Sequence, residues 1–221
     1  MKVLAIDTAT ERCSVALRHE GRVIERVVDT ERNHAELVLP MVSEVLTEAR
    51  VELRTLDGIA YGRGPGAFTG VRIAVSVVQG LAFGANLSVV GISDLTAIAQ
   101  QVAYPGAEIL VCVDARMGEV YWGTFVVAPD SGLAILVGEE RVDRPEQVRL
   151  RAPTVLAGTG FSAYPQLAHR APDATIHERA LPQARDIAML GELELAAGRG
   201  CPAAQAQPVY LRNQVVSVRT L

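Results

Sequence analysis

Two aspartates stand where ATPases and sugar kinases place a carboxylate that orients a metal-bound water. Asp7 follows an apolar run and precedes Thr8, and Asp114 follows a second run of the same kind. In such enzymes a turn of small residues then holds phosphate on its backbone amides. Here the turn over residues 8–12 has no glycine, and the turn after Asp114 lacks the expected Asp-x-Gly. Asp7, Thr8 and Asp114 therefore form at most a degenerate nucleotide site. The alternative, which we favour, is that both aspartates end strands and cap turns.

A glycine-rich segment, residues 62–72, precedes a predicted helix and is the densest motif in the chain. It contains four glycines and Pro65. Backbone amides at the positive end of a helix can hold an anion, so one interpretation is an anion site. The other is structural, because glycine allows a tight turn from a strand into a helix. The sequence leaves both interpretations open.

Groups that perform nucleophilic, acid–base or metal chemistry are scarce. Lys2 is the only lysine, so neither a Walker A loop nor the strand lysine of a protein kinase can be built. His34 begins a predicted helix, but Val38 stands one turn later, so no i,i+4 histidine pair is available for a metal ion. There is no Gly-x-Ser-x-Gly motif, and no cysteine lies in a reactive motif. We expect no catalytic residue, no metal and no resident cofactor.

Composition places the chain among globular proteins. It has 221 residues, 49% hydrophobic and 21% charged, with a net charge of −4, so alone it is poorly suited to bind nucleic-acid phosphates. Cys13, Cys112 and Cys201 are odd in number and unpatterned, which is typical of the reducing cytoplasm. Asp7 interrupts the apolar start, so we expect no signal peptide. The uncharged stretch 73–93 has the length of a membrane span, but its glycines favour a helix followed by a strand, without a membrane.

Hydrophobic periodicity predicts alternating strands and helices on both sides of a break at residues 104–106. We therefore predict a duplicated mixed α/β fold with two ribonuclease H-like lobes, residues 1–104 and 105–221. The tail from Gln205 is expected as strand or coil, one option being that it packs back on the first lobe. The predicted strands are 2–7, 13–19, 22–29, 57–62, 88–92, 108–114, 119–127, 134–140 and 154–158, and the predicted helices are 33–50, 71–86, 93–103 and 184–198.

Two predicted helices, 33–50 and 71–86, carry more apolar surface than one sheet needs to cover. Apolar residues fill about 200° of the first, whereas a helix lying on one sheet needs about 100°. The second also has small residues every four positions, Ser76, Gly80 and Gly84, which lets another backbone come close. Either the chain covers these helices itself, or they bind another protein. The predicted interface residues are Val38, Met41, Val45, Val71, Val75, Val78 and Gly80.

Four segments of the sequence resemble a known family. They are VLAIDTAT at 3–10, HAELVLP at 34–40, GPGAFTGVRI at 64–73 and DARMGEVY at 114–121. These segments are similar to those of the TsaB (YeaZ) family, subunits of bacterial tRNA threonylcarbamoyladenosine biosynthesis. Beyond Ala128 the resemblance rests on length and general pattern.

The resemblance implies an actin-like (ASKHA) fold and a non-catalytic paralogue of the transferase subunit TsaD. TsaD carries a two-histidine metal motif on the helix where this sequence has only His34. The resemblance also implies that the two first-lobe helices pair with a TsaD homologue or a second copy, and that the small ATPase TsaE takes part. Transfer RNA would be reached only through the complex, and a nucleotide at the partner interface stays an option.

On this basis we predict a cytoplasmic scaffold that activates TsaD. The complex would modify the adenosine next to the anticodon in tRNAs reading codons that begin with A. The alternatives are an actin-like ATPase or kinase, a glycoprotease-like enzyme, and a homodimeric binding module. The missing phosphate-turn glycines count against the first, and the single helical histidine counts against the second.

Overall fold

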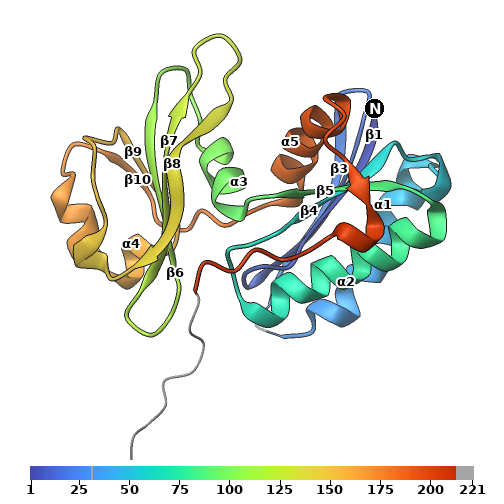
Figure 1. The fold of residues 1–221 in the computed structure, drawn as a ribbon, viewed down its shortest axis with the longest axis horizontal. Coiled ribbons are helices and arrows are strands. Elements are labelled where there is room, and N and C mark those ends of the chain that lie inside the picture. Colours follow the sequence, from blue (N-terminus) through green and yellow to red (C-terminus); the bar gives the residue numbers. More distant parts are fainter. Residues whose placement is uncertain (31, 213–221) are drawn as a thin grey trace, which may run out of the picture.

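The computed structural model describes residues 1–30 and 32–212, which form two lobes, each built around one sheet (Figure 1). Helices lie against both sheets, and the described part of the chain ends, at residue 212, between the lobes in this view. The elements are β1 (Lys2–Asp7), β2 (Arg12–His19), β3 (Arg22–Asp29), α1 (His34–Ala49), η1 (Leu53–Thr55), β4 (Gly58–Gly62), α2 (Phe68–Ala85), β5 (Ser88–Ile92), α3 (Asp94–Gln101), β6 (Glu108–Asp114), β7 (Val120–Val127), β8 (Ala134–Asp143), η2 (Pro145–Gln147), β9 (Val155–Ala157), α4 (Gly160–Ala163), η3 (Pro165–Arg170), β10 (Thr175–His177), α5 (Ala184–Ala196), β11 (Cys201–Pro202) and η4 (Ala203–Gln205).

The two sheets share one strand arrangement. The first has the order β11-β5-β4-β1-β2-β3, and the second has the order β10-β9-β6-β7-β8. In each lobe the first strand, β1 or β6, pairs antiparallel with the next strand and parallel with a later one, β4 or β9. This repetition of mixed sheets flanked by helices confirms the predicted duplicated α/β fold.

The first sheet is covered on both faces because the side chains of its central strand alternate between them. Leu4 and Ile6 pack into the core formed with α1 and α2, whereas Val3 and Ala5 pack into the core formed with α5. All four side chains are fully buried. The first lobe therefore has three layers, with α1 and α2 on one face and α5 on the other.

The second sheet follows the same scheme with a thinner cover. Ile109 and Val111 of β6 pack on the side of α3, and Leu110 and Cys112 pack on the side of α4 and η3. The face that carries α1 and α2 in the first lobe is thus covered in the second by short helical turns alone.

The lobes exchange one helix each, which corrects the predicted boundaries 1–104 and 105–221. The helix after β5, α3, packs against the second sheet, where Leu95 and Ile98 join the core. The helix after β10, α5, packs against the first sheet through residues such as Ile187, and β11 extends that sheet. Periodicity located both helices but could not show that each covers the other lobe's sheet.

Helix α2 begins at Phe68, three residues before the predicted start at Val71. By length and composition α2 could cross a membrane, and it is the one helix of the described chain that could. The core helix of a soluble protein meets the same criterion. Six residues of α2 are buried, and the helix contacts β1, β4 and β5 of the first sheet.

Candidate functional site

The turn after β1 is closed by the start of α2. Asp7 Oδ1 accepts a hydrogen bond from the Ala9 amide at 3.0 Å, and Thr8 Oγ1 donates to the Gly70 carbonyl oxygen at 2.7 Å. A methyl group on Gly70 would collide with the Thr8 carbonyl oxygen, and one on Gly66 would collide with the Ala9 carbonyl oxygen. The glycines of segment 62–72 therefore let two backbones touch, which favours the structural interpretation of this motif over the anion site.

Asp7 also belongs to a buried pair of carboxyl groups. Its partner is Asp94, the first residue of α3, and the two carboxyl groups lie against each other. Both are almost fully buried, and both surround Gly62, where any added methyl group would collide with them. Asp94 Oδ2 accepts a hydrogen bond from the Gly64 amide at 2.5 Å. The pair thus ties the end of β1 to the glycine-rich loop and to the first turn of α3.

One proton explains the geometry of this pair. Oδ2 of Asp7 and Oδ1 of Asp94 are buried, and neither accepts a hydrogen bond from an N–H or hydroxyl donor. Burial raises the pKa of Asp7 to about 6, and burial together with the Asp7 charge raises the pKa of Asp94 well above its usual value. Two adjacent buried carboxyl groups cannot both ionise at low cost. A proton held by Asp94 and donated to Asp7 satisfies both side chains.

The corresponding turn of the second lobe is more open. Asp114 Oδ1 accepts a hydrogen bond from the Arg116 amide at 2.9 Å, and Asp114 forms an ion pair with the Arg116 guanidinium at 3.2 Å. The Asp114 amide donates to Thr159 Oγ1. Within the described residues no hydrogen bond or ion pair joins Asp7 or Thr8 to Asp114. Each aspartate caps the turn that follows its own strand.

His34, the one histidine of helix α1, is held by the chain itself. Its Nε2 donates a hydrogen bond to the Thr10 carbonyl oxygen at 2.9 Å, which fixes the start of α1 on the β1–β2 turn. Over residues 1–30 and 32–212, no three His, Cys, Asp or Glu side chains gather closely enough to hold a metal ion.

Most of the predicted interface residues face the wrong way. Six of the seven are buried, and five of those join one core cluster against the first sheet, so they cannot touch a partner. The reason is that the apolar arc of both helices is wider than packing on the sheet requires. The helices use the additional apolar surface to pack beside each other. The interface prediction is therefore wrong for the six buried residues, Val38, Met41, Val45, Val71, Val75 and Val78. Gly80 is exposed.

Exposed residues recur on the other side of α2. Every fourth residue from the first position of the helix to the last turn is exposed, and we call this row the outer stripe of α2. Beside it Phe83 is 83% exposed, and on neighbouring α1 Leu39 is 50% exposed. The outer stripe consists of Phe68, Arg72, Ser76, Gly80 and Gly84.

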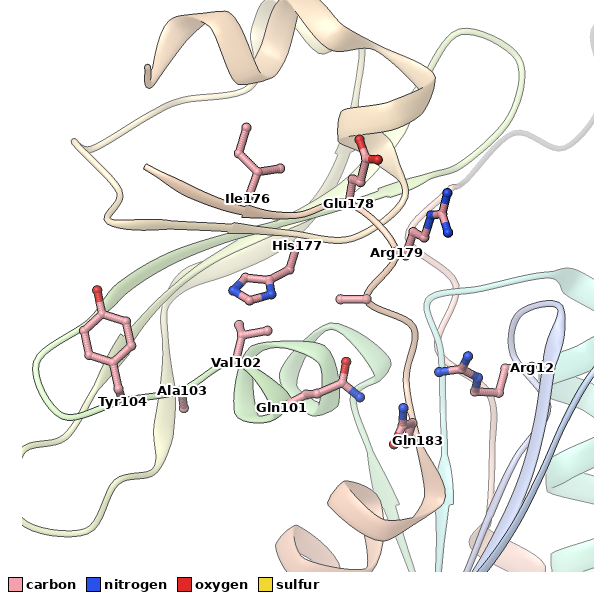
Figure 2. Close-up of a pocket in the computed structure, with 11 residues that line it drawn as sticks. Arg12, Gln101, Val102, Ala103, Tyr104, Ile176, His177, Glu178, Arg179 and Gln183 are labelled. Atoms are coloured by element: carbon pink, nitrogen blue, oxygen red, sulfur yellow. The ribbon is translucent and has the colours of Figure 1, made fainter. Parts of the chain in front are cut away.

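A groove of about 730 Å³ lies elsewhere, between the end of α3 and the segment that leads into α5 (Figure 2). It is lined by polar and apolar residues from three segments, and the polar ones include Arg12, Gln101 and His177. Arg12 is already engaged with Asp29 at 2.7 and 2.9 Å. None of the residues of the predicted nucleotide site lines this groove.

Sequence reasoning missed Asp94. The residue before it, Ser93, is the N-cap of α3, and its Oγ accepts a hydrogen bond from the Thr96 amide at 3.2 Å. An aspartate in the first turn of a helix is usually exposed, where it favours the helix dipole. No local pattern signals that Asp94 is instead buried against Asp7, because that contact depends on how β1 and α3 meet.

Comparisons with known proteins agree with the fold. The model of the family described as "TsaD: tRNA N6-adenosine threonylcarbamoyltransferase" matches residues 28–195. The "tRNA threonylcarbamoyladenosine biosynthesis protein TsaB" of Escherichia coli (strain K12) is 40% identical, covering 97% of this chain and 96% of that protein. The protein of the same name from Haemophilus influenzae is 38% identical, covering 97% and 95%. The solved structure of "YeaZ from Pseudomonas aeruginosa" superimposes with a TM-score of 0.85 at 43% identity, covering 95% and 99%.

Proposed function

This chain belongs to the TsaB (YeaZ) family of tRNA threonylcarbamoyladenosine biosynthesis proteins, and we propose that it is a non-catalytic subunit that binds and activates the TsaD threonylcarbamoyltransferase. The complex, with the TsaE ATPase, would modify the adenosine beside the anticodon in the cytoplasm. The observation that carries this proposal is the outer stripe of α2. In the free chain a homodimer would use the same surface.

The two glycines of the outer stripe have no purpose within the chain. Glycine inside a helix costs about 1 kcal/mol relative to alanine. A methyl group at Gly80 or Gly84 would meet nothing within 4 Å, so neither position needs glycine for its own packing. The neighbouring Phe83 ring is almost fully exposed to solvent. A second backbone that packs closely along the stripe would account for both features.

A helix of the partner fits this surface best. Small residues at spacing four form a shallow groove along a helix, and a second helix can lie in it at short distance. Phe68 and Phe83 stand near the two ends of the stripe and supply apolar area for burial. Leu39 of α1, the helix beside α2, is exposed as well.

The groups that could react are occupied inside the chain, which supports a non-catalytic role. Asp7 holds the Ala9 amide and the Asp94 carboxyl, and Thr8 holds the Gly70 carbonyl. His34 holds the Thr10 carbonyl. The proposal is therefore that this subunit acts by ordering TsaD rather than by supplying reacting groups.

The test is a comparison of two exposed helix positions on opposite faces of the first lobe. Ser76→Glu places a charge on the outer stripe, and Leu193→Glu, at an exposed position of α5, is the matched control. Both proteins should fold. Ser76→Glu should weaken the complex with the TsaD homologue about 100-fold, because an unpaired charge in a dry interface costs roughly 3 kcal/mol.

The functional assay uses the TsaD and TsaE homologues, threonylcarbamoyl-adenylate and tRNA. Omitting this chain should lower tRNA modification strongly, and Ser76→Glu should resemble omission while Leu193→Glu resembles the wild type. Modification that is equally fast without this chain would overturn the activating role. Normal binding by Ser76→Glu would place the interface elsewhere.

A further inference from the structure

The last described residues, 206–212, run along the first lobe and end on the second, and we call them the C-terminal strap (Figure 1). The Ala206 carbonyl accepts a hydrogen bond from Gln79 Nε2 at 2.9 Å. The Gln207 amide donates to the Tyr61 hydroxyl at 3.0 Å. These contacts fasten the beginning of the strap to α2 and β4.

The middle of the strap lies against the glycine-rich loop. The Val209 amide donates to the Arg63 carbonyl oxygen at 2.7 Å. A methyl group on Gly64 would come within 2.8 Å of the Val209 carbonyl oxygen, and Gly64 has a φ of +98°. Gly64 is thus the place where the loop leaves room for the strap. Its amide also donates to Asp94, so Gly64 connects the strap to the buried carboxyl pair.

Tyr210 joins the strap to the first turns of α2. Arg72 Nε donates to the Tyr210 hydroxyl at 2.7 Å, and the Arg72 guanidinium carbon lies 3.6 Å from the centroid of the Phe68 ring. The Phe68 and Tyr210 rings are 5.7 Å apart, and each is nearly half exposed. This cluster extends the outer stripe of α2 with a residue of the strap, so a protein docked along the stripe would also touch Tyr210.

Arg212 joins the strap to the second lobe. Its Nε donates to Glu119 Oε2 at 3.0 Å, and its Nη2 donates to the Ala115 carbonyl oxygen at 3.1 Å. The guanidinium also forms an ion pair with Glu119 at 2.5 Å. These groups belong to the turn after Asp114, in which Arg116 and Met117 both have positive φ, at 61° and 58°. Residues other than glycine adopt this conformation at a cost, so the turn depends on such contacts.

We propose that the C-terminal strap couples the partner surface on α2 to the turn at 115–119 of the second lobe. A helical protein segment bound on the outer stripe would contact Tyr210 and restrict the motion of the strap. Arg212, at the other end of the strap, would then restrict the motion of the turn at 115–119. The inference rests on the proposed function, because the bound partner is TsaD on the outer stripe. Tyr210 and Arg212 are positioning residues, and neither performs chemistry.

The experiment cuts the second-lobe end of the strap and leaves the partner surface intact. Arg212→Ala removes the bridge, Glu119→Gln removes its ion pair, and Arg199→Ala is the control. Arg199 forms an equally short two-point bridge with Glu194 on α5, at 2.5 and 2.7 Å. All three should fold, because these side chains lie at the surface or partly buried. In the free chain, amide exchange at 115–119 should rise about fivefold in the two strap variants and stay unchanged in Arg199→Ala.

The decisive readouts are partner affinity and stimulated rate, measured separately. The TsaD homologue should slow exchange at 115–119 in the wild type but not in Arg212→Ala or Glu119→Gln. Both variants should bind TsaD within about threefold of the wild type, yet stimulate modification at least fivefold less at saturation. Tyr210→Ala should lose affinity as well as stimulation, because it removes surface from the stripe.

Failure of this inference can be told apart from failure of the proposed function. If the wild type binds and stimulates TsaD, but the two strap variants stimulate equally well, the coupling is refuted and the subunit role stands. The same holds if TsaD leaves exchange at 115–119 of the wild type unchanged. If the wild type itself neither binds nor stimulates TsaD, both proposals fall.

Discussion

The two lobes have the same sheet topology but differ in how that sheet is covered. One face of the first sheet carries α1 and α2, of 16 and 18 residues. The corresponding face of the second sheet carries η2, α4 and η3, of three, four and six residues. Long helices with a second, exposed side occur only in the first lobe of the described chain. A duplicated topology therefore does not indicate which of the two lobes binds a partner. The two lobes differ in the helices that cover their sheets.

The turns after β1 and β6 also differ, because the first is covered by other elements and the second is more open. Asp7 is fully buried, pairs with Asp94 and lies beneath the start of α2. Asp114 is partly exposed and pairs with Arg116 at the surface. The first lobe is thus closed at the position where the second lobe is open and held by the C-terminal strap. Substitutions at matched positions can test this contrast.

The largest effect is expected from a charge on the inner side of α2. Val78 is fully buried in the first-lobe core, so Val78→Asp should cost about 4 kcal/mol or more and leave little folded protein. Gly80→Asp, two residues later on the outer stripe, should remain folded. Thermal unfolding followed by circular dichroism separates the two. A folded Val78→Asp protein that only fails to bind its partner would show that the inner side is the interface after all.

A smaller loss is expected where α2 closes the first turn. Gly70→Ala should lower the free energy of unfolding by about 3 kcal/mol, because the methyl group meets the Thr8 carbonyl oxygen of a fixed backbone. The matched change in the open turn is Gly118→Ala, which meets nothing within 4 Å but keeps a φ of +78°. It should cost only about 1 kcal/mol. Chemical denaturation of both proteins measures the difference, and equal losses would contradict the contrast between the turns.

The buried carboxyl pair should make the first lobe sensitive to pH. The folded-state pKa of Asp7, about 6, lies above its ordinary 3.8, so folding favours the protonated form. Its stabilising contribution is complete below about pH 4 and is lost as the pH rises toward 6, and Asp94 extends that loss to higher pH. Over this range the wild type should lose roughly 2 to 3 kcal/mol relative to Asp7→Asn/Asp94→Asn.

Unfolding in denaturant at pH 4, 5, 6 and 7 measures this difference. Asp186, whose pKa burial also raises to about 6, is present in both proteins and therefore cancels. Parallel pH profiles for the two proteins would refute the shared proton.

The elements of this fold follow from the sequence because their signals are local. β1, β3, β5 and β6 have the predicted bounds, since a run of branched apolar residues ends at a polar or turn residue in each case. The N-cap of α3, Ser93, has a signal of the same local kind, because capping depends on residues within one turn. The duplication was visible as two similar apolar runs ending in aspartate.

The site residues could be predicted less well because they depend on contacts between distant segments. An apolar arc shows that a helix is buried on one side, but Val78 and Gly80 are only two positions apart and face opposite surroundings. The assignment of α3 and α5 to lobes failed for the same reason, since the apolar stripe of a helix does not indicate which sheet the helix covers. Arg212 bridges to Glu119 across 93 residues, and no local pattern contains that information.

The smallest effect, and the one with opposite signs in two assays, is expected at Gly80. Gly80→Ala should stabilise the free protein by about 1 kcal/mol, because alanine is the better helix former and its methyl group meets only solvent. For a domain of this size that is a rise in Tm of about 2 to 4 °C. The same methyl group should hinder a backbone packed along the outer stripe, so affinity for the TsaD homologue should fall. A natural sequence that keeps the less stable residue at an open position is explained if the partner needs the space.

Gly198→Ala is a poor control because its φ is +73°, whereas Ser76→Ala removes only a hydroxyl from the same stripe and should leave binding nearly unchanged. Gain of both stability and affinity in Gly80→Ala would show that no close backbone contact forms there, and the difference between the lobes would then be one of internal packing alone.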